Sequence, residues 1–366
     1  MASTRYLYWL VLMNSLINII NFVPRELIDA RFKGAQTSIL LATVLGTFLI
    51  YLFTSLMSKF PGKGVPEIYE KSLPRLLASP LIVIFALLWC LAGIITLLSF
   101  VDITLRFISP DTGPYYIIIS FLFVVCLCAR MDSLSLLYGL EMMLGISLPL
   151  ILYTTFKAVI NRDFNWDAVL QIMTFAPHAP DLKSVMAATF TFSGYVNLAI
   201  FNRVFHKLKL KHRWIMGVQG FFVLLLTFFV PIGYYGTMGV ERHVYTWFST
   251  ADSIRIESFL IERMLYIFYF AYVTMSLVSV IIHWHVGKEM LMSLFPPSKH
   301  KVSRAKRWQE AIILSLFCAV TLTLMNLDQY QLNNLGVFFL NARGAGELLI
   351  SAVLFYCYLD VRRRKI

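Results

Sequence analysis

The stretch YLYWLVLMNSLINIINFV, residues 6–23, decides the fold, because it runs from Tyr6 to Val23 without a charged residue. A helix needs about 20 mostly apolar residues to cross the hydrocarbon core of a bilayer. This run is longer than a signal-peptide core, and no cleavage pattern of small residues follows it. We therefore expect it to be a retained first membrane span.

The composition of the whole chain agrees with that expectation. Of 366 residues, 58% are hydrophobic and 14% are charged, and the mean hydropathy is +0.72. Soluble domains average about 45–50% apolar and ~25% charged residues, so a soluble fold is excluded. The net charge of +12 does not indicate a nucleic-acid partner, because the basic residues lie between apolar runs instead of forming one face.

We expect an all-α polytopic membrane protein with about ten transmembrane helices, forming a single domain over residues 1–366. Each span must pair its backbone groups internally, which in an apolar run favours a helix. The predicted spans are Tyr6–Val23, Ser38–Met57, Pro80–Phe100, Pro114–Cys128, Leu134–Phe156, Met186–Phe201, Trp214–Tyr235, Phe259–His283, Gln309–Met325 and Asn341–Leu359.

The positions of lysine and arginine predict the orientation, since positive charge collects on the cytoplasmic side. With the N-terminus inside, most of the 32 basic residues fall in cytoplasmic segments. These include a basic loop at 298–307, which we expect to contact anionic lipid headgroups, and a basic tail at 360–366. Both termini are then cytoplasmic.

Span 1 carries three amides on one helical face. Asn14, Asn18 and Asn21 follow i, i+4, i+7 spacing within an otherwise apolar run. One interpretation is a ladder of interhelical hydrogen bonds, each worth about 0.6–2 kcal/mol. The other is a ligand site, because three amides in one short stretch are more than packing requires.

Span 6 is interrupted by Thr189, Thr191, Ser193, Gly194 and Asn197. Glycine tolerates the backbone angles of an opened helix, so Gly194 is the expected break. Opened backbone at membrane depth occurs only where it is buried in protein or lines a cavity. A close crossing of two helices through small residues is the alternative.

Spans 1 and 6 are equivalent members of two halves of five spans, and five is odd. The halves, about 6–156 and 186–359, would therefore be inverted repeats. Polar or broken segments at matching positions of such halves indicate a ligand site near the midplane.

Three further charged groups lie in or beside spans. Glu141 in span 5 is either a coupling acid or a structural one. Arg343 and Glu347, one turn apart at the expected outer start of span 10, are interpreted as a local ion pair. The five cysteines match no metal or disulfide framework, and no enzyme motif is present. We therefore expect no metal, no cofactor and no enzymatic activity.

After the second predicted span comes Lys59-Phe60-Pro61-Gly62-Lys63, followed by an acidic-aromatic segment from Glu67 to Lys71. These segments resemble the B subunits of spore germinant receptors, the endospore germination permeases of the amino acid–polyamine–organocation superfamily. The turn Pro110–Pro114, Ala129-Arg130 with Glu141, Phe192-Ser193-Gly194-Tyr195, and Pro24 after span 1 are also similar to that family. Ile17 stands where the family usually has glycine, and Val196 where it often has glutamate.

The resemblance implies a LeuT-like fold of five plus five inverted spans with broken helices 1 and 6. It also implies a pocket between spans 1, 3, 6 and 8 for a small germinant, typically an amino acid. The implied partners are the A and C subunits of a germinant receptor, and the implied location is the spore inner membrane or the cell membrane.

The expected function is therefore germinant sensing on a transporter scaffold. A proton- or sodium-coupled amino acid permease and an ion-conducting channel subunit remain open as alternatives. The predicted ligand-binding residues are Asn14, Ile17, Asn18, Asn21, Thr191, Ser193, Gly194, Tyr195 and Asn197.

Overall fold

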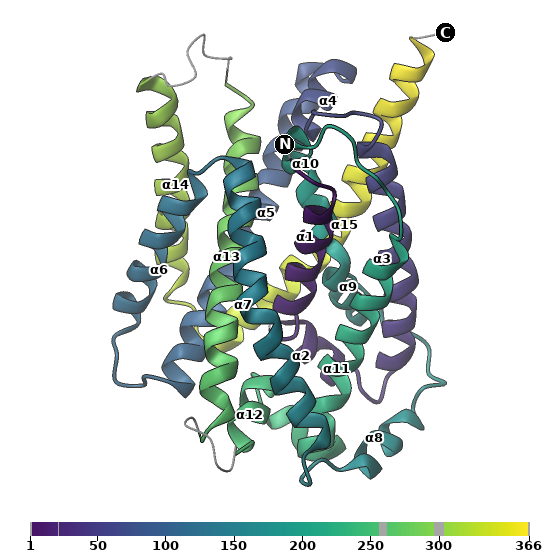
Figure 1. Cartoon of the computed structure of the whole chain (residues 1–366), viewed down its shortest axis with the longest axis vertical. Helices are drawn as coiled ribbons and strands as arrows, with labels where there is room; N and C mark the ends of the chain where they lie inside the picture. Colours follow the sequence, from purple (N-terminus) through teal and green to yellow (C-terminus); the bar gives the residue numbers. More distant parts are fainter. Residues whose placement is uncertain (1, 21, 256–261, 296–303, 365–366) are drawn as a thin grey trace.

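The computed structural model describes residues 2–20, 22–255, 262–295 and 304–364 as a bundle of helices (Figure 1). In these ranges the helices of the first half are α1 (Arg5–Ile17), α2 (Phe22–Asp29), α3 (Ala35–Met57), α4 (Val65–Ser72), α5 (Arg75–Phe107), α6 (Pro114–Ala129), α7 (Ser133–Ile160) and α8 (Trp166–Met173). The second half contains α9 (Leu182–Thr189), η1 (Phe190–Asn197), α10 (Leu198–Phe201), η2 (Asn202–Val204), α11 (Trp214–Gly239), η3 (Val240–Arg242), α12 (Thr246–Ser253), α13 (Met264–Met292), α14 (Arg304–Leu324) and α15 (Gln329–Arg363).

The described residues contain fewer candidate spans than the ten predicted. Eight helical segments are long and apolar enough to cross a membrane, and the bent pair α1–α2 makes a ninth. The predicted span Pro114–Cys128 corresponds to α6, an apolar helix of 16 residues, about 24 Å long, and its crossing of the membrane stays a prediction. The protein is an all-α polytopic membrane protein.

Side-chain caps set several helix starts. The carboxylate of Asp132 accepts a hydrogen bond from the Ser135 N–H at 3.0 Å at the start of α7, and Asp181 does the same for Ser184 in α9. Asp328 and Gln331 form a reciprocal capping box that begins α15. Such caps satisfy backbone donors that have no partner inside the helix.

The two described ends of the chain lie at the same end of the bundle, together with α4, while α8 and α12 lie at the opposite end (Figure 1). This arrangement follows from an even number of crossings. The cytoplasmic placement of that end stays a prediction.

Pairs of helices at equivalent positions of the two halves pack against each other. Contacts join α1 to η1, α3 to α11, and α5 to α13. The fourth and ninth spans also meet, because the sulfur atoms of Cys126 on α6 and Cys318 on α14 are 3.2 Å apart. Helices at non-equivalent positions, such as α7 with α13 and α3 with α9, also pack together, so these contacts do not test the division into two repeats, which stays a prediction.

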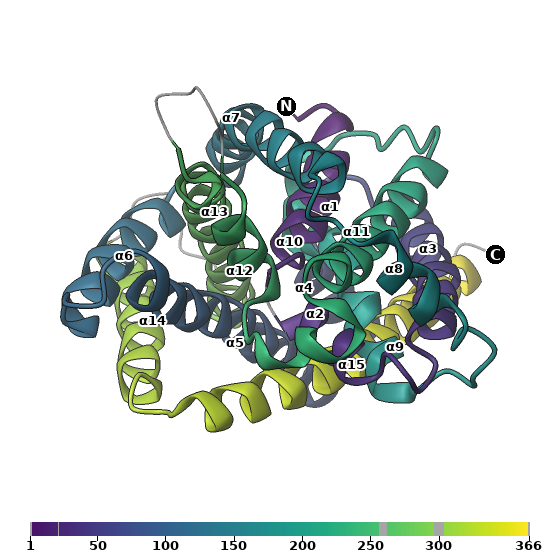
Figure 2. The same cartoon turned by 90° about the horizontal axis from the view of Figure 1, so that it is seen from below.

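The sixth span lies in the protein interior, while the ninth lies at the edge. The most apolar window of Leu182–Val204 is 94% buried, and that of α14 is 22% buried. Seen from below, α6 and α14 stand at one side of the bundle and α1 lies near its middle (Figure 2). Spans 1 and 6 therefore have other helices around them on several sides.

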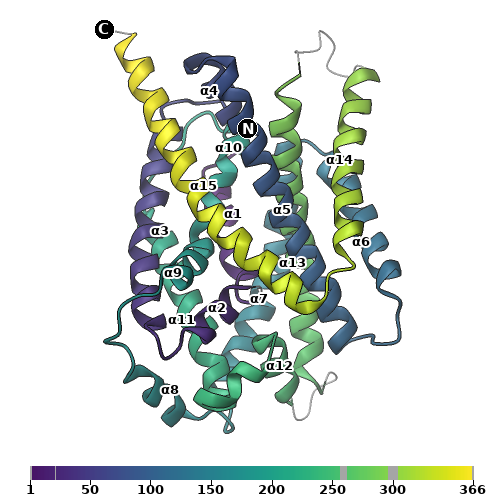
Figure 3. The same ribbon diagram turned by 180° about the vertical axis from the view of Figure 1, so that it is seen from behind.

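The last helix, α15, is much longer than predicted and crosses the bundle obliquely (Figure 3). It begins at Gln329 instead of Asn341 and continues through Asp360–Arg363, so most of the predicted basic tail is helical. In the predicted basic loop 298–307, residues 304–307 belong to α14, and 298–303 lie outside the described residues. Span 8 begins at Met264, and 259–261 also lie outside them.

Candidate functional site

Span 1 is broken in the middle of the bundle. The helix α1 ends at Ile17, α2 begins at Phe22, and their axes differ by 55°. Pro24 lies in the first turn of α2, where a missing N–H costs no helical hydrogen bond. The predicted ligand residue Asn21 lies outside the described residues. The resemblance implied a broken helix 1, and the break follows Ile17.

The amide face of span 1 points at span 6. The Asn14 side-chain amide donates to the carbonyl oxygen of Phe190. The Ser15 hydroxyl donates to the carbonyl oxygen of Thr191 at 2.8 Å, and the Asn18 amide donates to its own helix, to the carbonyl of Asn14 at 2.7 Å. Interhelical hydrogen bonding therefore explains part of the amide pattern. The carbonyl oxygen of the Asn18 side chain is buried and has no partner among the described residues.

Span 6 loses α-helical geometry where the sequence indicated, but it does not unwind. Residues Phe190–Asn197 form a 3₁₀ helix between α9 and α10, and the span continues without a sharp bend. A Cβ atom at Gly194 would lie 2.3 Å from the carbonyl oxygen of Leu10 and 2.6 Å from the Cα of Val11. Gly194 therefore permits the close crossing with α1, which was the alternative interpretation of its small residues.

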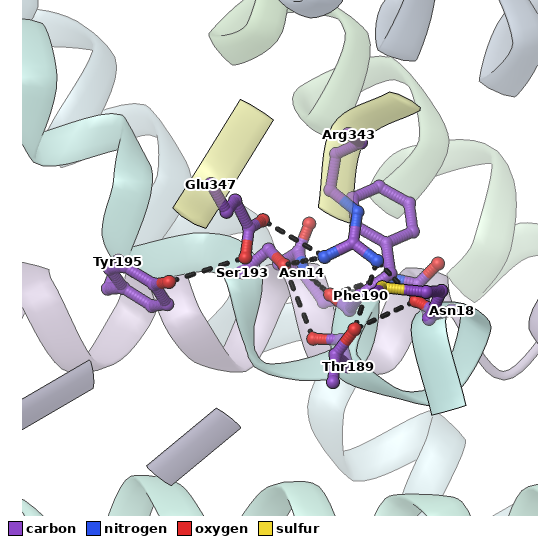
Figure 4. A network of polar contacts seen from close by, with 9 residues as sticks. Asn14, Asn18, Thr189, Phe190, Ser193, Tyr195, Arg343 and Glu347 are labelled. Atoms are coloured by element: carbon purple, nitrogen blue, oxygen red, sulfur yellow. Dashed lines mark hydrogen bonds and ion pairs between the residues drawn. The ribbon is translucent and has the colours of Figure 1, made fainter. Parts of the chain in front are cut away.

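A buried ion pair on α15 holds this 3₁₀ segment from the other side (Figure 4). A nitrogen of the Arg343 guanidinium lies 3.1 Å from a carboxylate oxygen of Glu347, and both side chains are under 10% exposed. The same guanidinium donates to the hydroxyl groups of Ser193 at 3.0 Å and Thr189 at 3.1 Å, and to the carbonyl oxygen of Met186. It also lies over the ring of Phe190.

The acid of this pair has a second partner in span 6. The Tyr195 hydroxyl donates to the other oxygen of Glu347 at 3.3 Å. The Nε of Arg343, in contrast, is buried without an acceptor among the described residues. The network links α15 to both ends of η1 and leaves one charged donor unsatisfied.

A cavity lies between α1, η1, α5, α13 and α15. Its polar lining includes Asn14, Ser193, Asn197, His283, Arg343 and Glu347, and the rest is Phe85, Leu88, Trp89, Ala92, Phe190, Val196, Phe339, Gly346 and Ile350. The cavity has a volume of about 30 Å³. That is enough for about two water molecules.

One wall of the cavity is a hydrogen bond between spans 3 and 6. The Trp89 indole donates to the side-chain oxygen of Asn197 at 2.8 Å, and the Asn197 amide donates to the carbonyl oxygen of Gly194 at 3.2 Å. Three of the nine predicted ligand residues, Asn14, Ser193 and Asn197, belong to the lining.

The other described candidates do not belong to the lining of the cavity. Ile17, Asn18, Thr191 and Tyr195 are buried, and the Thr191 hydroxyl has no partner among the described residues. Glu141 lies elsewhere, where it accepts hydrogen bonds from Arg5 at 2.9 Å and from the Tyr6 hydroxyl at 2.8 Å. Those contacts join α7 to the start of α1, as a structural acid would.

The sequence matches the family model for spore germination proteins over residues 10–331. The chain belongs to the spore germination protein family. No curated protein matches it. The family match covers most of the chain and agrees with the resemblance carried by the segment Lys59–Lys63 and by Phe192–Tyr195.

Reasoning from the sequence missed twelve of the fifteen lining residues in this family member, among them Arg343, Glu347 and Trp89. Arg343 and Glu347 were interpreted as an outer ion pair, and the pair exists, but it lies beside the cavity. Trp89 was unremarkable in an apolar span. The polar residues between Gln329 and Arg343 were a signal that the last helix begins earlier than its apolar run. A longer and tilted helix can bury Arg343.

Proposed function

We propose that this chain is the germinant-sensing subunit of a spore germinant receptor and binds a small molecule, of the amino acid type, in the central cavity. The observation that carries the proposal is the cavity itself. It lies beside the break in span 1 and the 3₁₀ segment of span 6, and amides and an ion pair reach it from three spans.

The polar groups around the cavity are incompletely satisfied, which supports a ligand. Buried polar groups are nearly always hydrogen-bonded, and each exception asks for an explanation. Arg343 in the cavity wall has one such atom, its Nε, among the described residues, while Asn18 and Thr191, which are buried but not part of the lining, have one each. A small solute with an acceptor group would supply the partner that the Arg343 Nε lacks.

The cavity is too small for an amino acid in this conformation. We therefore propose that the structure is a closed form and that a germinant binds a second form in which spans 3 and 6 separate. A ligand that binds one of two forms shifts their equilibrium by its difference in affinity. The A and C subunits in the spore inner membrane would receive that change as the signal.

A thermal-shift screen tests the binding step. The full chain in lipid nanodiscs would be heated with single L-amino acids, sugars and nucleosides. A ligand that binds only the folded protein raises its apparent stability, so at least one amino acid should raise the unfolding temperature. A screen in which sugars or nucleosides, and no amino acid, produce a shift would contradict the amino acid assignment.

A matched pair of variants then tests the place of binding. Asn197→Leu removes an amide of the cavity lining and leaves a polar group of the bound ligand without a partner, which costs about 1–3 kcal/mol. Loss of the bond to Trp89 favours the open form by about 1 kcal/mol, so the net weakening of binding should be up to about 30-fold. Asn341→Leu is the control, because that amide donates only to Val337 of its own helix. Spores with the first variant should need correspondingly more germinant.

A second candidate is an amino acid permease, and one observation favours it. Glu347 is an acid in the cavity wall, where a coupling group of a proton-driven transporter would lie. Uptake of a labelled amino acid into proteoliposomes, lost in Glu347→Gln, would indicate transport. Binding without uptake would indicate sensing.

A further inference from the structure

The ion pair in the cavity wall is poorly explained by stability alone. Removing two charges from water costs several kcal/mol per ion, and well-packed apolar residues often serve equally well. Arg343 and Glu347 are one turn apart on the same helix, so their mutual contact ties no two spans together. Charged groups this deep in a membrane protein are functional candidates for this reason.

The charge balance of the cavity restricts what can enter. Of the described lining residues, Arg343 and Glu347 are the two that carry a full formal charge at neutral pH, and their charges cancel. A solute with a net charge would leave one buried charge uncompensated, which is strongly unfavourable in a low-dielectric site. A zwitterion brings one charge of each sign and preserves the balance.

The bonding of the pair leaves room for such an exchange. The guanidinium makes bonds to span 6 that do not involve Glu347, and its Nε has no acceptor among the described residues. Glu347 keeps Tyr195 as a partner when Arg343 turns away. Each member of the pair can therefore release the other without losing all its contacts.

We infer that Arg343 and Glu347 are the charge-recognition subsite of the cavity and exchange their mutual contact for a zwitterionic ligand. The ligand carboxylate accepts hydrogen bonds from Arg343, and the ligand ammonium donates to Glu347. Apolar residues of the lining, among them Phe85, Phe339 and Ile350, receive an apolar side chain of the ligand. The subsite selects net-neutral α-amino acids with apolar side chains and rejects lysine-like and glutamate-like ones. This inference rests on the proposed function, because it assumes that the cavity binds a small molecule.

The test compares ligands that differ in one charge. Glycine, L-alanine, L-valine, L-leucine, L-isoleucine, L-methionine and L-phenylalanine would be titrated into the full chain in nanodiscs, each beside its carboxamide and its N-acetyl derivative. The carboxamide is a cation and the N-acetyl derivative is an anion. For the wild-type chain, the best amino acid should bind at least tenfold more tightly than either derivative.

Single variants should change this preference in opposite directions. Glu347→Gln gives the cavity a net positive charge, so the affinity for the N-acetyl derivative, relative to that for the amino acid, should rise tenfold or more. Arg343→Gln gives the cavity a net negative charge, so the relative affinity for the carboxamide should rise. Asp102→Asn and Arg106→Gln are the matched controls, because that pair has the same i, i+4 spacing at 2.8 Å but lies outside the cavity lining. They should leave the preference unchanged.

A double variant keeps the test informative if the single variants fold poorly. Arg343→Met combined with Glu347→Leu removes both charges together and leaves no isolated buried ion. It should lose the preference for the zwitterion. If the amino acid still binds tenfold better than both derivatives in this variant, or if the wild-type chain shows no such preference, the inference is wrong and the proposed function stands. A wild-type chain that binds no amino acid of this panel contradicts the inference, and one that also binds no other amino acid of the thermal-shift screen contradicts the proposed function as well.

Discussion

The indole N–H of Trp89 on α5 donates to the side-chain oxygen of Asn197 in η1 at 2.8 Å, and this bond closes one wall of the central cavity. Trp89 is half-buried, while Asn197 is buried. The bond joins the third span to the 3₁₀ segment of the sixth. A movement that separates these two spans must break it first.

Changing Trp89 should alter both the stability of the closed form and the size of the ligand. Trp89→Phe keeps most of the ring and removes the donor, so the closed form should lose about 1 kcal/mol, the usual worth of one hydrogen bond. Trp89→Ala also removes the ring and should shift binding toward larger amino acids. Titration of L-alanine and L-phenylalanine into both variants measures this. Equal preference in wild type and Trp89→Ala would place the ligand elsewhere.

The close crossing of spans 1 and 6 should not tolerate a side chain at Gly194. In Gly194→Ala the new methyl group meets backbone atoms of Leu10 and Val11, which cannot rotate away. Overpacking of this kind costs about 1–3 kcal/mol or more, so the unfolding temperature and the yield of folded protein should fall. Gly139→Ala on α7 is the control, because its added Cβ would meet no atom within 4 Å. An unaffected Gly194→Ala variant would contradict the crossing.

The break in span 1 and the interruption of span 6 were predictable, and the role of α15 was not. Asn14 and Asn18 are costly in an apolar run, so their contact with a partner helix could be inferred from the spacing alone. Arg343 and Glu347 are equally costly inside a span, but a hydropathy profile places the end of a span at charged residues. The helix in fact starts at Gln329 and runs obliquely, so these residues lie within it.

The sequence also did not determine the local backbone geometry of span 6. Gly194 is compatible with an opened helix and with a close crossing, and only the position of Leu10 and Val11 decides between them. The cavity is formed by side chains from five spans, including Trp89 and Phe339. The residue pattern within one span does not predict which other spans will pack against it.

The packing of the fourth span on the ninth should allow a cross-link. The sulfur atoms of Cys126 and Cys318 are 3.2 Å apart, so a mild oxidant such as copper phenanthroline should join them through a disulfide. With a protease site introduced in the segment 296–303, cleavage gives one fragment with Cys126 and one with Cys318. On a denaturing gel the two fragments should migrate as one band until a reductant is added. Cys126→Ser should abolish the link and Cys128→Ser should not. Fragments that separate without reductant would contradict the contact.

Arg203 should hold the bundle closed at the end where both termini lie. Its guanidinium bridges Glu67 on α4 at 2.6 Å and Glu289 on α13 at 3.0 Å. Arg203→Gln should weaken that end by about 1 kcal/mol, which corresponds to roughly fivefold more of an opened form. In a variant with Cys90 as the single cysteine, maleimide should then label that buried thiol several times faster.

Arg213→Gln is the control for this end of the bundle. Arg213 lies close by but donates to Tyr51, Thr54 and Ser55 of a single helix, α3. It should leave the labelling rate of Cys90 unchanged. If both variants accelerate labelling equally, the bridge from Arg203 to its two acids has no special part in closure.

Because α15 is long and lies obliquely, a small rotation near its middle produces a larger displacement at its C-terminal tip. From Arg343 to Arg363 the helix spans about 30 Å at 1.5 Å per residue. A swing of about 5° around the ion pair would therefore carry the C-terminal arginines sideways by about 2.6 Å. A neighbouring subunit in contact with this tip would then respond to a ligand in the central cavity without contacting the cavity itself.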